Sequence, residues 1–163
     1  MNFVSALLTG GRTSRLYDAL VLDRRIATYV GSVLGPGERF PRLFMVDGYP
    51  RAPHTTADLE EAVYAELASL AETGPEEIEL ERVRNQLEAG AVRRLQTNFG
   101  LALQLAGSAS LFGDWRTTFG LEERMAAVTA EDVQRVVRTY LRTENRTVAT
   151  LVKTPPPAQA SPQ

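Results

Sequence analysis

The chain has 163 residues and a formal net charge of −2, with 44% hydrophobic and 23% charged residues. This is the composition of one ordinary globular domain, which excludes a disordered or collagen-like chain. The small negative charge argues against nucleic acid as a partner, because phosphate contacts require an excess of basic residues.

Three residue types limit the chemistry further. The chain has no cysteine, which excludes disulfides, iron–sulfur clusters and thiol nucleophiles, and leaves the cellular compartment open. It has one histidine, His54, so a metal site with two imidazoles cannot form within it. Its single lysine, Lys153, lies near the C-terminus. We therefore expect no catalytic residue, no metal ligand and no cofactor in this chain.

The first third of the chain predicts two short helices followed by a β-hairpin. Apolar residues at helical spacing indicate a helix over Phe3–Leu8, which Gly10-Gly11 ends. A second helix is expected over Ser14–Arg24, with Ser14 or Thr13 as its cap. Stretches rich in β-branched and aromatic residues then predict strands at 26–34 and 42–49.

Helices dominate the remainder. Capping boxes at Thr55–Asp58 and Thr129–Asp132 each predict a helix start, and Gly74–Glu77 ends one helix and begins the next. Leu95–Gly113 carries no charge over 19 residues but is too polar for a membrane span, so we expect a buried helix. It would pack closely through small residues, namely Gly100, Ala102, Ala106 and Gly107. Thr147–Val152 is predicted to be a last strand.

This order of elements predicts an α+β fold, in which an antiparallel sheet carries helices on one face. Only three strands can be named, and a helix opens at residue 2, so we expect that a preceding strand is missing. The expected organisation is one domain over residues 1–153, truncated at its N-terminus, followed by a Pro-rich flexible tail over 154–163.

Three motifs have both a functional and a structural interpretation. Gly10–Arg15 combines glycines, arginines and hydroxyls at a helix start, which can hold an anion, but helix-stop and helix-cap rules also explain it. His54 has no acid or hydroxyl partner fixed by spacing, which favours a surface histidine. The acidic run Glu76–Glu81 fits the first turn of a helix better than a calcium or magnesium site.

Three segments, in order and correctly spaced, resemble the pitrilysin/insulinase family, which includes the mitochondrial processing peptidases. Leu7–Tyr17 is similar to its Leu-Gly-Gly-Gly-x-Ser-Ser-Arg-Leu-Tyr segment, and Glu72–Leu87 to its Gly-(Pro/Val)-x-x-x-Glu-Leu-x-x-x-Lys helix. Residues 127–134 and 140–147 resemble its closing helix–strand unit.

The resemblance implies a two-half architecture. In that family one half carries zinc on a His-x-x-Glu-His motif, and a metal-free second half completes a chamber around an unfolded peptide. This chain resembles the second half. The implied partners are an N-terminal zinc-bearing half, on the same chain or on another subunit, and a peptide substrate, with zinc expected on the partner half.

One departure from the family concerns substrate binding. Some second halves carry an arginine and, seven positions later, a tyrosine that hold the substrate; the matching positions here are Val21 and Thr28. Tyr29 comes one residue late, and in a strand one residue changes the face, so Tyr29 could replace that tyrosine only through a bulge. No substrate-binding residue is assigned.

These observations leave three hypotheses. The first is the non-catalytic C-terminal half of a zinc metalloendopeptidase. The second is a degenerate scaffold or binding subunit of the same family with no peptidase activity. The third is a phosphate- or nucleotide-binding module built on Gly10–Arg15, in which saturable anion binding would be lost on Arg12→Ala.

Overall fold

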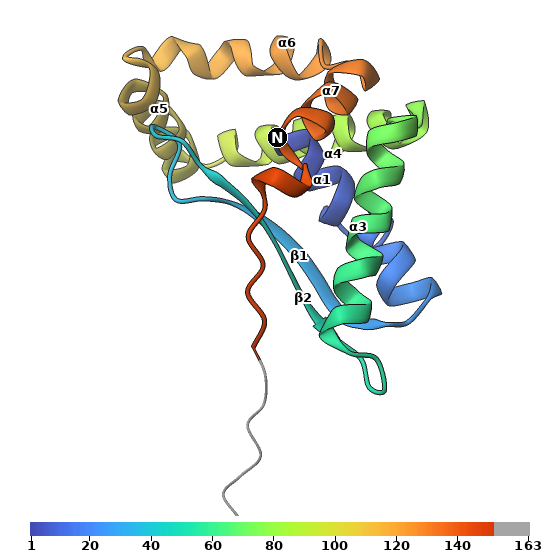
Figure 1. The fold of residues 1–163 in the computed structure, drawn as a ribbon. Coiled ribbons are helices and arrows are strands. Elements are labelled where there is room, and N and C mark those ends of the chain that lie inside the picture. Colours follow the sequence, from blue (N-terminus) through green and yellow to red (C-terminus); the bar gives the residue numbers. More distant parts are fainter. Residues whose placement is uncertain (152–163) are drawn as a thin grey trace, which may run out of the picture.

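The computed structural model describes residues 1–151, leaving aside the side chains of residues 121 and 122. It has the α+β fold expected from the sequence, with one antiparallel hairpin and a larger helical part (Figure 1). In chain order the elements are α1 (Asn2–Thr9), α2 (Arg15–Tyr17), the π-helical turn η1 (Asp18–Asp23), β1 (Ala27–Gly35), β2 (Leu43–Pro50), α3 (Thr56–Thr73), α4 (Glu77–Leu95), α5 (Asn98–Phe112), the 3₁₀ turn η2 (Trp115–Gly120), α6 (Leu121–Ala126), α7 (Ala130–Tyr140) and the 3₁₀ turn η3 (Thr143–Asn145).

The hairpin is the only sheet of the described residues. Its strands pair from Ala27 opposite Pro50 to Gly35 opposite Leu43. Helix α1 packs against β1 and helix α3 against β2. The hairpin runs across the molecule from the start of α3 toward α5 (Figure 1).

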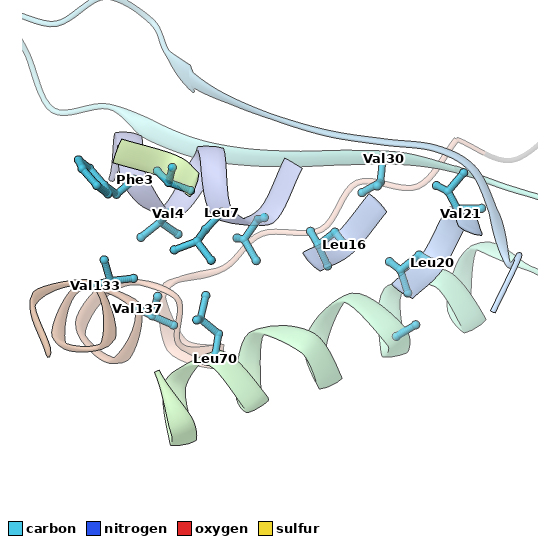
Figure 2. Close-up of a cluster of buried hydrophobic side chains, with 14 of the residues drawn as sticks. Phe3, Val4, Leu7, Leu16, Leu20, Val21, Val30, Leu70, Val133 and Val137 are labelled. Atoms are coloured by element: carbon cyan, nitrogen blue, oxygen red, sulfur yellow. The ribbon is translucent and has the colours of Figure 1, made fainter. Parts of the chain in front are cut away.

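The core lies between the hairpin and the helices (Figure 2). Leucines of the first two helical segments form its centre, because Leu7, Leu8, Leu16 and Leu20 are all completely buried. Val30 of β1 joins them from the sheet. Helices α3, α4 and α7 add further buried residues, namely Leu59, Leu70, Leu80, Val83, Val133 and Val137.

Most helix starts follow the expected capping chemistry. The Thr55 and Thr129 hydroxyls accept from the backbone N–H groups of Asp58 and Asp132, which confirms both capping boxes. Ser14 differs from its expected role. Its hydroxyl donates to the Gly11 carbonyl at 2.6 Å, so it closes the preceding turn and leaves the helix start without a side-chain cap.

The expected strand over 147–152 is not observed in the part that the structure describes. Residues 147–151 make no backbone hydrogen bond to the hairpin, and Leu151 is 97% exposed. A short apolar segment becomes a strand only where a sheet edge accepts it, and β2 here pairs with β1 alone. Val152 and the predicted tail, 154–163, lie outside the described residues.

Helix α5 is also less buried than its composition indicates. Thr97 begins a new helix by accepting from the Gly100 N–H, which separates α5 from α4. Only Ser108 of α5 is buried, and the small residues expected to pack closely do not lie in the core. The prediction of a buried helix is therefore wrong. Among the described helices none is long and apolar enough to cross a membrane.

The core predicts a contrast between two leucines of η1. We expect Leu20→Ala to lower the free energy of unfolding by about 3 kcal/mol, because it removes a completely buried side chain and leaves a cavity. The exposed Leu22 provides the matched control, and Leu22→Ala should cost under about 1 kcal/mol. Urea unfolding followed by circular dichroism measures both. Equal losses would contradict this description of the core.

Candidate peptide-contact surface of the sheet

The hairpin has one covered face and one open face. Successive residues of a strand point to opposite faces, so Val30 and Leu34 face the helices together with their opposite neighbours on β2. On the other face, exposed large side chains follow one another along both strands. These are Tyr29, Val33, Leu43, Met45 and Tyr49, which we call the open face.

Cross-strand pairing determines the arrangement of the open face. Tyr29 lies opposite Tyr49 with ring centroids 5.7 Å apart, and Val33 lies opposite Met45. Between these pairs, Gly31 lies opposite Asp47, the single charged residue at the open-face positions of the two strands. The surface is therefore aromatic at one end, aliphatic at the other and acidic at its centre.

A β-bulge at the start of β1 brings Tyr29 to this face. Ala27 pairs with Pro50 and Tyr29 with Tyr49, so β1 uses one more residue than β2 and the register shifts. Ala27 is completely buried, yet Thr28 and Tyr29 are both exposed. The bulge through which Tyr29 could replace the tyrosine of the family is therefore present. Just before it, Arg25 has a φ of 53°, a conformation that most residues avoid.

A shallow groove of about 300 Å³ runs along the free edge of β1. The segment from α1 to α2 supplies one wall through Thr9, Arg12 and Tyr17, and residues 29–32 of β1 supply the other. A Cβ atom on Gly31 would collide with the Tyr29 hydroxyl, so the missing side chain lets the Tyr29 ring lie across the strand. An edge strand with such a groove can accept an extended peptide through backbone hydrogen bonds.

The hydroxyl groups beside this groove have no catalytic arrangement. The Ser32 hydroxyl lies 2.8 Å from that of Ser5 and 2.6 Å from that of Thr9, which also donates to the Ser5 carbonyl. A nucleophilic hydroxyl requires a base as its partner. Within residues 1–151 these three hydroxyls bond only to each other and to that carbonyl, so they fix α1 to β1.

The Gly10–Arg15 motif has a structural role at the junction of α1 and α2. A Cβ on Gly10 would clash with the Ala6 carbonyl, and Gly11 has a φ of 126°, so both positions require glycine. Arg15 donates two hydrogen bonds to the Glu79 carboxylate, at 2.8 and 2.6 Å, and a third to the Gly74 carbonyl at 3.2 Å. Arg15 is already paired with Glu79, and α2 is only three residues long, too short to offer an anion site at its N-terminus. The structure therefore favours the helix-junction interpretation over anion binding.

The other polar candidates lie apart from one another. His54 is exposed in the loop before α3. In the acidic run, Glu76 and Glu79 form a capping box, and Glu77 pairs with Arg84 at 3.2 Å. No group of three potential metal-ligating side chains occurs among the described residues, so the residues present do not fit a zinc ion.

Comparison with known proteins determines the family. Residues 1–87 match the family described as the peptidase M16 inactive domain. The chain belongs to this family. No curated protein matches the chain.

Solved structures agree with the family and the fold. A candidate zinc protease from Bordetella pertussis Tohama I has 27% identity and a TM-score of 0.75, over 90% of this chain and 79% of that one. The inactive peptidase domain of a candidate zinc protease from Bordetella parapertussis has 24% identity and a TM-score of 0.81, over 98% and 84%. A Helicobacter pylori protease has 19% identity and a TM-score of 0.76, over 86% of this chain but only 34% of that one.

The arginine and tyrosine positions of the family can now be located in this M16 inactive domain. Val21 is buried in the core, so its side chain is not available to a substrate (Figure 2). The Thr28 hydroxyl donates to the Tyr49 carbonyl at 3.2 Å. The aromatic hydroxyl nearest to Thr28 in the sequence is Tyr29, which regular strand alternation places on the opposite face unless a bulge is present. The bulge at the start of β1 decides which face Tyr29 occupies, and no sequence signal revealed it.

The ion pair between Arg15 and Glu79 gives this M16 domain a pH-dependent stability. Burial raises the pKa of Glu79, but hydrogen bonds from Arg15 and from the Glu76 N–H lower it by more, so the pKa lies below its ordinary value of 4.5. The stabilisation is thus present above the unfolded-state pKa and is lost as the pH falls through the lower folded-state pKa.

We expect Glu79→Gln to lower the free energy of unfolding by about 2 kcal/mol at neutral pH, because it removes a charge-assisted bidentate contact. The difference from the natural chain should shrink as the pH falls below the ordinary glutamate pKa of 4.5, because the unfolded chain then takes up a proton more readily than the folded chain. Denaturant unfolding across the pH range measures it, with Glu81→Gln in the same helix as a control. A loss independent of pH would contradict the ionic origin.

Proposed function

We propose that this chain is the non-catalytic C-terminal half of a zinc metalloendopeptidase, in which the open face of the hairpin forms part of the wall around an unfolded peptide. The zinc site would lie on another half of the same chain or on a partner subunit. The observation that carries the proposal is an exposed apolar sheet face in a domain of this family.

The chemistry of the open face suits an unfolded peptide. The side chains of Val33, Leu43 and Met45 offer aliphatic and adaptable contact area, and methionine adjusts to neighbours of different shape. Tyr29 and Tyr49 add large rings whose hydroxyls remain available to polar groups. Such a surface can contact peptides of many sequences without being specific for any one of them, as a chamber wall requires.

The free edge of β1 supports the same role. An extended peptide can satisfy its backbone groups along this edge, beside the groove lined by Thr9, Arg12 and Tyr17. Residues 1–151 offer no group of three metal-ligating side chains, so the proposal assigns no bond-breaking step to them. Its contribution is to bind and align the peptide while the partner half cleaves it.

A photo-crosslinking experiment tests the wall. Val33, on the open face, and Val92, on α4, are 50% and 48% exposed, so they form a matched pair. Replacing each in turn by p-benzoylphenylalanine and irradiating with β-casein, an unfolded protein, should give severalfold more crosslinked product from position 33. Equal yields would reject the open face as a peptide-contact surface.

The same proposal predicts the behaviour of the isolated chain. Purified without a partner, it should hold no stoichiometric zinc by mass spectrometry and should not cleave β-casein, because a catalytic zinc needs three protein ligands. A chelator should leave its thermal unfolding unchanged. Stoichiometric zinc or casein turnover would show that the catalytic site lies within this chain.

A further inference from the structure

A second open surface lies among the helices, away from the open face of the sheet. It is a groove of about 880 Å³ lined by α4, α5, η2, α6, α7, the start of α1 and the turn of the hairpin. Figure 1 shows α5 facing the hairpin turn on one side of this region and α7 near α1 on the other. We call it the helical groove.

Apolar residues at helical spacing make up much of the walls of the helical groove. Helix α5 contributes Leu103, Gly107 and Leu111, which follow one another at intervals of four residues. Helix α4 contributes its C-terminal half in the same way. The apolar lining from α4 and the segments after α5 consists of Leu87, Ala91, Leu95, Phe119, Met125, Val128, Val133 and Val136.

The middle of the groove is empty. A Cβ atom placed on Gly107 would meet no other atom within 4 Å, although this glycine lies in the middle of α5. Beside it, Ser108 is buried and accepts a hydrogen bond of 2.7 Å from the Thr118 hydroxyl, so its polarity is satisfied. At this point the groove therefore offers open space beside a hydroxyl pair that is already hydrogen-bonded, which suits an apolar occupant.

The charged residues that line the groove carry a net positive charge. Its lining includes four arginines but only two acidic residues. Arg42 pairs with Glu38 at 3.4 Å, and Arg135 pairs with Asp132 at 2.7 Å. Arg94 and Arg124 remain as an excess of positive charge, in a chain whose net charge is −2. This local reversal of sign favours an acidic occupant.

The shape distinguishes a docked helix from a small molecule. Leu103, Phe112 and Phe119 line the groove and are themselves 63%, 55% and 59% exposed, so one long side is open. Small-molecule sites bury about 70–90% of their ligand, whereas an amphipathic helix buries only its apolar face. The α5 wall from Leu103 to Phe112 is about 14 Å long, which matches about two and a half helical turns.

We propose that the helical groove binds an amphipathic helix of a partner protein, with apolar residues on one face and acidic residues along its flanks. Its apolar face covers the exposed leucine and phenylalanine side chains of α5. Its acidic flanks pair with Arg94 and Arg124. The proposal does not depend on the function proposed for the sheet face, since the two surfaces share no lining residue.

A designed peptide tests this in the full chain. The probe is a fluorescein-labelled helix of about 14 residues, with Leu at positions i, i+3, i+4 and i+7 and Glu at the remaining positions. Fluorescence anisotropy should show saturable binding that weakens as salt increases. The same peptide with Lys in place of Glu should bind at least about tenfold more weakly.

Two pairs of variants locate the site. Gly107→Leu places a side chain where a Cβ atom meets no other atom within 4 Å, so it occupies part of the groove and should weaken binding at least about tenfold. Ala109→Leu enlarges an exposed residue of the same helix, outside the groove lining, and should leave binding within about twofold. Arg94→Glu should weaken binding similarly, while Arg93→Glu, the adjacent residue, should not. Circular dichroism verifies that every variant is folded.

Several results would overturn the proposal. They are absence of binding, equal affinity for the Glu and Lys peptides, and unchanged binding to Gly107→Leu. Sedimentation velocity of the chain alone adds another: a dimer that Gly107→Leu dissociates would show that a second copy of the chain occupies the groove.

Discussion

The structure depends on the packing of the first helices against a single face of the hairpin. A two-stranded hairpin is marginally stable on its own in water, so this one requires the helices beneath it. Completely buried leucines of α1, α2 and η1 supply this support, each contributing about 2 kcal/mol on burial. Because the helices stabilise the hairpin from one side, the other side needs no covering layer of its own and stays free to bind.

The bulge at the start of β1 reconciles two demands on one strand. Ala27 belongs to the core, and Tyr29 two residues later would face the core as well if the alternation were regular. The additional residue, Thr28, moves Tyr29 to the open face and leaves Val30 buried beneath the strand. The left-handed Arg25 immediately precedes this point. Irregular backbone of this kind is costly and is characteristic of positions where a side chain must be aimed.

Features that depend on a few neighbouring residues could be predicted from the sequence. The capping boxes at Thr55 and Thr129, the limits of the hairpin and the α+β class belong here, because caps, turns and strand propensity are local. The bulge could not be predicted, since it follows from the burial of Ala27 in a core assembled from distant segments. The same reason explains the errors at α5 and at 147–151, where an apolar sequence does not specify what will cover it.

The two open surfaces differ in the sign of their charge, so the partners proposed for them differ in charge as well. Asp47 lies at the centre of the sheet face, whereas arginines predominate at the rim of the helical groove. A strongly acidic segment suited to the groove would be repelled by Asp47, and a neutral or basic peptide suited to the sheet would gain nothing from Arg94. The hairpin nevertheless belongs to both surfaces, because its strands carry the open face while Glu38 and Arg42 in its turn line the groove. A helix seated in the groove would therefore hold the turn of the same hairpin whose strands we propose to contact a peptide, so the hairpin would connect the two surfaces directly.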